Sequence, residues 1–277
     1  MGLLYNPAFL GYNAQYEIGM NIRTQWIGLD DSPSSFSIFG SSKIPNQNIS
    51  FGGYIFRDQS ETLSANGAGL TISYTLQKFL NDDSQLSLGF GTKYLQFGLN
   101  SSNLIARDQP AFESYLGSEQ TNTFDIDFGF HFVSNNPAKE ESFFEIGIAV
   151  QNLISQLSNT NSINNRISTQ SSYNAYISYT YEDYNFSISP KLWINRNLYS
   201  PTRVLFGLES KIDKQFIVGL FYSNESTLFT SLGYTFKKFG NKNSNLKILA
   251  FPGYYFGSFD RGSGVSFDIG AYFTRIL

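Results

Sequence analysis

The chain lacks cysteine, and it lacks any long uninterrupted run of apolar residues. With no cysteine among 277 residues, neither disulfides nor thiolate metal sites hold the protein together. No run of about 18 apolar residues occurs, which excludes a transmembrane helix. The absence of cysteine is neutral about compartment, because many exported proteins need none.

Charge is also scarce. Charged residues make up 15% of the chain, well under the usual quarter of a soluble domain, and the net charge of −3 gives no basic field for nucleic acid. Aromatic residues are abundant at 17%, with 27 Phe and 18 Tyr, yet the mean hydropathy is only −0.20. This combination suits a sheet with one face in lipid and the other in water.

Alternation of apolar and polar residues is the dominant pattern. The stretch 124–132 has Phe or Ile at every even position and Asp, Gly or His at the odd ones. Alternation of the same kind recurs at 70–76, 144–151 and 265–274. Successive side chains of a strand point to opposite faces, so one face is bulky and apolar while the other is small and polar. We therefore predict strands that face lipid on one side and a lumen on the other.

The alternating segments define the expected fold class, an all-β antiparallel transmembrane β-barrel of the outer membrane with about 14 strands. We expect one barrel domain over residues 1–277, with residues 1–15 ahead of the first strand. Counts of 12 or 16 strands stay open, because boundaries from one sequence are uncertain. The candidate strands are 16–28, 34–40, 48–56, 67–77, 85–98, 123–133, 143–153, 172–181, 184–194, 202–211, 215–223, 227–237, 246–256 and 264–276.

The predicted connections are unequal in length. The longest are 57–66, 99–122 and 154–171, all on the outer side if the N-terminus is periplasmic. Short turns such as 212–214 then face the periplasm, which is the asymmetry expected of outer-membrane barrels. The segment Met1–Tyr5 lacks the charged start and apolar middle of a signal peptide, so we expect the natural signal peptide to be absent from this chain.

Candidate chemistry is sparse. His131, the one histidine, shares the polar face of its strand with Asp125 and Asp127, and a lumenal hydrogen-bond network explains it better than catalysis. The acidic pairs at 30–31 and 82–83 predict turns, since neither has the ligand spacing of a calcium-binding loop. We expect no enzyme activity, no cofactor and no metal site.

Two further residue classes have structural interpretations. Glycines within strand patterns, at 52–53, 89 and 91, predict bending or close packing in the lumen, because no helix follows to make a phosphate cradle. Aromatic residues near strand ends predict interface girdles, with stacking against a sugar or peptide as the alternative. These aromatic residues are Trp26, Tyr54, Tyr94, Tyr181, Trp193, Tyr254 and Tyr255.

The N-terminal segment is the most distinctive part of the sequence. Asn6, Pro7, Ala8 and Gly11 predict a turn ahead of the barrel, because Pro fixes one backbone dihedral and Gly frees another. The stretch 23–33 then predicts a strand that runs into a tight outward turn.

Within that stretch, Arg23 and Gln25 share strand parity, so both are expected to face the lumen. Trp26 is then expected to face lipid. Gly28, Asp30 and Pro33 complete the hairpin, and nothing physical in these residues names a ligand.

These residues resemble the PorP/SprF family of Bacteroidota outer-membrane proteins. The family opens with Asn-Pro-Ala-x-x-Gly and continues with an Arg-x-Gln-Trp-x-Gly hairpin followed by Pro, and both motifs match here. The 34–38 strand and the Gly-rich stretch 51–53 continue the match. Asn152 and Leu153 align with an Asn-His-Leu region of the family, without its histidine.

The resemblance implies a part in type IX secretion or the linked gliding motility machinery. The implied partners are membrane lipid, a secreted adhesin or its C-terminal domain, and lipoproteins or ring components of the secretion system. Partner contact through the two N-terminal motifs is the site hypothesis that follows, and the family is not known for catalysis.

A second hypothesis is a transporter or channel for a hydrophobic or small polar solute, since a barrel of about 14 strands has room for a lumen. Fatty-acid transporters have a similar strand number but a longer N-terminal plug than the 15 or so residues here. A third hypothesis, an outer-membrane enzyme, rests on His131 alone.

Overall fold

The computed structural model describes most of the chain, and no described helix is long and apolar enough to cross a membrane. The described residues are 2–11, 14–28, 32–60, 63–99, 120–135, 141–154, 170–197, 200–240, 243–256 and 264–275.

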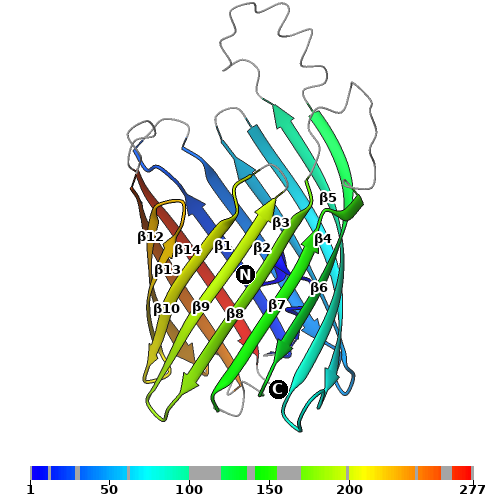
Figure 1. Cartoon of the computed structure of the whole chain (residues 1–277), viewed down its shortest axis with the longest axis vertical. Coiled ribbons are helices and arrows are strands. Elements are labelled where there is room, and N and C mark those ends of the chain that lie inside the picture. Colours follow the sequence, from blue (N-terminus) through cyan, green and yellow to red (C-terminus); the bar gives the residue numbers. More distant parts are fainter. Residues whose placement is uncertain are drawn as a thin grey trace, which may run out of the picture.

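The described residues form one short helix and a closed barrel of 14 antiparallel strands, in which each strand pairs with its sequence neighbours and β1 pairs with β14 (Figure 1). The elements are α1 (Gly2–Tyr5), β1 (Tyr16–Thr24), β2 (Ser34–Lys43), β3 (Ile49–Gln59), β4 (Leu63–Gln77), β5 (Gln85–Leu99), β6 (Gln120–Val133), β7 (Phe143–Gln151), β8 (Ser172–Glu182), β9 (Phe186–Asn197), β10 (Arg203–Ile212), β11 (Phe216–Ser223), β12 (Thr227–Lys237), β13 (Ser244–Tyr255) and β14 (Gly264–Arg275). Closure gives every strand a hydrogen-bonded partner on both sides, as a wall in lipid requires.

The two faces of the wall follow the sequence alternation. On β6, Phe124 and Phe128 point outward and are 55% and 48% exposed, whereas Asp125 and His131 point inward and are buried. The prediction of an apolar outer face and a polar lumenal face is confirmed, and so is the count of 14 strands.

Strand ends differ from the predictions by a few residues. β1 stops at Thr24, four residues before the predicted end, because Trp26 has a φ of 53° and cannot continue the strand. β7 stops at Gln151, and Asn152 with a φ of 60° turns the chain away. Asn tolerates this left-handed conformation better than most residues.

The two ends of the barrel have different connections. The turn end carries the start of β1, the end of β14 and short turns such as 183–185 and 213–215. At the opposite end, the loop end, β5 and β7 end and β6 and β8 begin (Figure 1). Most of the predicted loops 99–122 and 154–171 lie outside the described residues.

The aromatic residues predicted as interface girdles divide into two groups. Tyr94, Tyr181 and Tyr254 point outward and are 42–48% exposed, as a girdle requires. For two others the girdle prediction is wrong: Tyr54 is buried in the lumenal cluster, and the Trp193 ring contacts Tyr176 inside the barrel. Tyr255 also occupies an inward position, because it alternates with Tyr254 along β13.

Candidate functional site

Residues 2–11 lie inside the barrel and are called the N-terminal plug. Leu3 and Leu10 are 6% and 1% exposed and pack into a lumenal cluster of apolar side chains from the wall. Figure 1 marks the N-terminus within the outline of the barrel. The predicted turn ahead of the first strand is present, and the barrel wall surrounds it. The wall residues of the cluster are Phe39, Tyr54, Ile217, Leu249 and Tyr272.

Four wall glycines, called the glycine bed, make room for the plug. They are Gly52, Gly89, Gly129 and Gly147, from β3, β5, β6 and β7. A Cβ on Gly89 would overlap the plug backbone at residues 7–8, and Cβ atoms on the other three would crowd plug side chains. The predicted close packing at glycine 89 is confirmed, and its partner is the plug.

Asn6 fixes the plug to the wall. Its Nδ2 donates to the carbonyl oxygens of Phe130 at 2.9 Å and Ile148 at 3.4 Å, while its Oδ1 accepts from the Ala8 N–H at 2.8 Å. A side-chain amide both donates and accepts, so one buried residue bonds the wall and closes its own turn. Pro7 and Ala8 are buried beside it, and Gly11 ends the turn with a φ of 66°.

His131 lies behind the plug. Its ring stacks on Phe9 with centroids 4.1 Å apart, and its Nε2 is 3.8 Å from Glu145 Oε1. Glu145 also accepts a 2.8 Å hydrogen bond from the Ser178 hydroxyl. The predicted lumenal position of His131 is confirmed, and its acidic neighbour is Glu145 on the adjacent strand, a residue that single-strand patterns did not indicate.

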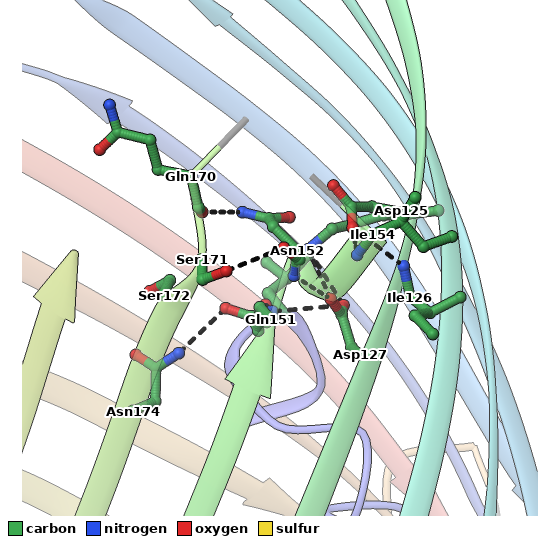
Figure 2. Close-up of polar contacts among 12 residues, drawn as sticks. Asp125, Ile126, Asp127, Gln151, Asn152, Ile154, Gln170, Ser171, Ser172 and Asn174 are labelled. Carbon is green, nitrogen blue, oxygen red and sulfur yellow. Dashed lines mark hydrogen bonds and ion pairs between the residues drawn. The ribbon is translucent and has the colours of Figure 1, made fainter. Parts of the chain in front are cut away.

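Asp125 and Asp127 hold the chain where it leaves β7, as Figure 2 shows. Asp127 Oδ1 accepts the N–H of Asn152 at 3.0 Å, and Asp125 Oδ1 accepts that of Ile154 at 2.9 Å. Carboxylates satisfy free N–H groups at the start of a helical turn. Buried Lys93 pairs with Asp127, its Nζ lying 2.9 Å from Oδ1 and 3.0 Å from Oδ2.

Gln151 joins this cluster to the plug. Its Nε2 donates to the Leu4 carbonyl at 2.9 Å, and its Oε1 accepts from Asn174 Nδ2 at 3.0 Å. Figure 2 shows the contact between Gln151 and Asn174. Asn174 in turn accepts from Asn195 at 2.7 Å, so amides on β7, β8 and β9 form a ladder along the lumen. Sequence reasoning missed this ladder. Inward strand parity was the only available signal, and it does not say which strands face each other.

The second motif forms the connection between β1 and β2. Arg23 pairs with Asp268 on β14, with Nε 3.4 Å from Oδ1, and it shares inward parity with buried Asn21. The Gln25 N–H donates to the Pro33 carbonyl at 2.9 Å and closes the base of the hairpin. The predicted lumenal position of Arg23 is confirmed.

Trp26 does not face lipid, so that prediction is wrong. A Cβ on Gly264 would overlap the Trp26 ring, and Gly264 has the inward parity of buried Ser266. The positive φ of Trp26 interrupts the alternation and turns the ring to the lumenal side of β14. Gly28 has a φ of 101°, which a glycine adopts without strain. Asp30 lies outside the described residues.

Metal chemistry has no support among the described residues, which contain no group of three or more His, Asp or Glu placed to hold an ion. The acidic pair at 82–83 lies in the turn between β4 and β5, where Lys78 pairs with Asp82 at 3.1 Å.

Comparison with known proteins identifies the family. The sequence profile of the family described as "Type IX secretion system membrane protein PorP/SprF" matches residues 1–248. The chain belongs to the PorP/SprF family. No protein of curated function matches its sequence.

Solved structures show the same fold at low sequence identity. A structure titled "CymD monoaromatic hydrocarbon channel" is 11% identical, with a TM-score of 0.59, over 100% of this chain and 92% of that one. The P. putida toluene transporter TodX is 8% identical, with a TM-score of 0.52, over 98% of this chain and 92% of that one. Identities this low show the fold alone.

The PorP/SprF protein is thus an outer-membrane β-barrel of the type IX secretion system. Its general partners are lipid and secretion machinery, and both its family and its fold are of non-enzymatic kinds.

Proposed function

We propose that this PorP/SprF barrel binds or anchors a secreted cell-surface adhesin and contacts periplasmic components of the type IX secretion and gliding machinery. Family membership supports the secretion role. The plug is the observation that favours a docking function over solute conduction. It occupies the lumen and is fixed to the wall by Asn6, the glycine bed and the apolar cluster.

Each motif has its own role within this proposal. Asn6, Pro7 and Ala8 are buried against the wall, so they hold the plug and offer no surface to a partner. Partner contact is assigned to the hairpin of residues 23–33, whose exposed Trp26 lies where β1 meets the loop end.

The alternative function is a channel for a hydrophobic or small polar solute. It draws support from the likeness to the CymD and TodX structures, whose titles describe hydrocarbon transport. That likeness concerns the fold, and a fold hosts many functions. Conductance in planar bilayers separates the two functions: docking predicts a closed barrel, and transport predicts a steady open pore.

The test in cells is deletion of the gene followed by complementation. Docking predicts that the deletion strain loses adhesin from its surface and stops gliding, and that the wild-type gene restores both. Normal adhesin display and gliding in the deletion strain would contradict the proposal.

Complementation with hairpin variants then tests the assigned contact. Trp26→Ala is expected to reduce adhesin display while the barrel is still made. The control is Phe206→Ala, which truncates an outward side chain, 58% exposed, on β10 and is expected to restore display. Barrel level is measured by immunoblot of outer membranes, so loss of the protein is distinguished from loss of docking.

A further inference from the structure

The loop half of the lumen has an apolar wall. Its residues come from five consecutive strands, β9 to β13, and all are inward-facing and half-buried. Leu205 pairs in register with Trp193, and Phe221 pairs with Phe229, so the wall is continuous. We call it the aromatic arc: Trp193, Leu205, Phe221, Phe229 and Phe251.

Glycines hold the rings of the arc flat against the wall. A Cβ on Gly207 would overlap the Phe221 ring, and one on Gly253 would crowd the Phe229 ring. A ring that covers a strand glycine lies along the wall of the lumen. Phe251 also packs against the apolar cluster around Leu3, so the arc adjoins this packed core at one end.

The opposite wall of the same half is polar. Buried Lys93 and Asp127 form their ion pair near the middle of β5 and β6, and the amide ladder of Gln151, Asn174 and Asn195 runs from it toward the arc. The lumen of the loop half thus carries the aromatic arc on β9 to β13 and the amide ladder on β7 to β9.

The plug forms the floor of this space. The glycine bed lies three or four residues from the turn ends of its strands, whereas arc residues lie two to four residues from the loop ends. Tyr5, the last residue of α1, contacts Trp193 of the arc with ring centroids 5.1 Å apart. It is still 41% exposed inside the barrel, so its ring borders accessible space above the plug.

We propose that this loop-half space is a receptor site for an extended peptide segment of a secreted partner, with an aromatic or aliphatic side chain on the aromatic arc. The proposal rests on the docking function and says where in the barrel docking occurs. A peptide presents an apolar side chain and backbone amides together, which matches a lumen split into apolar and hydrogen-bonding walls. Because the plug closes the floor, the segment enters and leaves at the loop end.

Tryptophan fluorescence tests the site directly. The chain has two tryptophans, so Trp26→Phe leaves Trp193, within the arc, as the sole emitter. The probes are blocked tripeptides, acetyl-Gly-Phe-Gly-amide and acetyl-Gly-Ala-Gly-amide, titrated into the detergent-solubilised full chain. The Phe probe is expected to change Trp193 emission with an affinity at least tenfold higher than the Ala probe. Equal responses, or none, overturn the proposal.

Matched variants assign the response to the arc. Phe221→Ala with Phe229→Ala is expected to lower the affinity for the Phe probe at least tenfold. Phe206→Ala with Tyr222→Ala truncates outward side chains, 58% and 52% exposed, on β10 and β11, and is expected to change it less than twofold. Equal effects of the two pairs overturn the proposal. If the variant with both arc substitutions does not fold, Tyr5→Ala is measured in its place. This variant is also expected to lower the affinity for the Phe probe at least tenfold, and an unchanged affinity would contradict the site.

A small apolar probe tests the competing occupant. Toluene is titrated under the same conditions, and a response to toluene without a response to the Phe tripeptide overturns the peptide assignment. The outcome is independent of adhesin display in cells. If the deletion strain loses adhesin display but the Phe tripeptide does not bind the barrel, docking occurs elsewhere on the barrel. If the tripeptide binds but the deletion strain displays adhesin normally, the docking function is contradicted.

Discussion

At the residue scale, the fit between Asn6 and the wall explains why the Asn-Pro-Ala sequence is needed. The Asn6 amide bonds carbonyls on β6 and β7 and closes the turn through Ala8. Gly129 lies opposite Asn6 and has no Cβ to collide with it. An apolar residue at position 6 would lose these hydrogen bonds, and a larger residue at position 129 would displace the amide.

The glycine bed gives the first prediction. Gly129→Ala places a Cβ against Asn6, and overpacking of this kind destabilises by about 1–3 kcal/mol. The measurement is the free energy of unfolding in urea, with the chain in lipid vesicles. Gly40→Ala is the control, because its Cβ would have no neighbour closer than 3.6 Å, and equal effects of the two changes would contradict the close packing.

The buried ion pair gives the second prediction. Lys93→Met leaves the Asp127 carboxylate without its cation at a buried position, which costs about 3–5 kcal/mol. Lys78→Met removes the exposed pair with Asp82 and is expected to cost about 0–1 kcal/mol. The same unfolding measurement compares the two, and a Lys93→Met loss as small as that of Lys78→Met would show that Asp127 relies on its N–H donors instead.

At the scale of elements, the plug is short but held at many points. A helix of one turn does not stabilise itself in water, so α1 depends on the wall that surrounds it. Leu3 and Leu10 bury against the apolar cluster, and Gln151 holds the Leu4 carbonyl. Because Gln151 also contacts Asn174, the plug is tied to the wall that carries the amide ladder.

Removal of the plug gives the third prediction. Deletion of residues 2–11 is expected to raise the single-channel conductance in planar bilayers at least severalfold, because the strands themselves are unchanged. The full chain measured at the same voltage is the control. A full chain that already conducts as well as the deletion variant would favour the solute channel over docking.

At the scale of the whole molecule, the barrel separates two surfaces. The turn end carries the start of β1 and the end of β14, and the loop end carries the hairpin of residues 23–33 and the entrance to the aromatic arc. Docking of a secreted partner requires the loop end to face the outside of the cell.

Cysteine labelling tests this orientation, and the cysteine-free sequence makes the experiment clean. Ser200→Cys places a thiol at the loop end, whereas Tyr184→Cys replaces a side chain 85% exposed in a turn at the other end. A membrane-impermeant maleimide added to intact cells is expected to label the first variant and spare the second. The control is labelling of both variants after cell lysis. The reverse pattern in intact cells would mean that the turn end of the barrel, and not the loop end, faces the outside of the cell.

The sequence by itself determined the wall of this protein. A strand in lipid must alternate, and a barrel must close to satisfy its backbone, so the period of two predicted 14 strands and their two faces. The contents of the lumen depended on tertiary structure. Asn6 and Phe130 are 124 residues apart, and only closure of the barrel brings them together. Strand parity says that a residue points inward but not what it meets there. For that reason the plug, the Glu145 partner of His131 and the inward turn of Trp26 required the folded molecule.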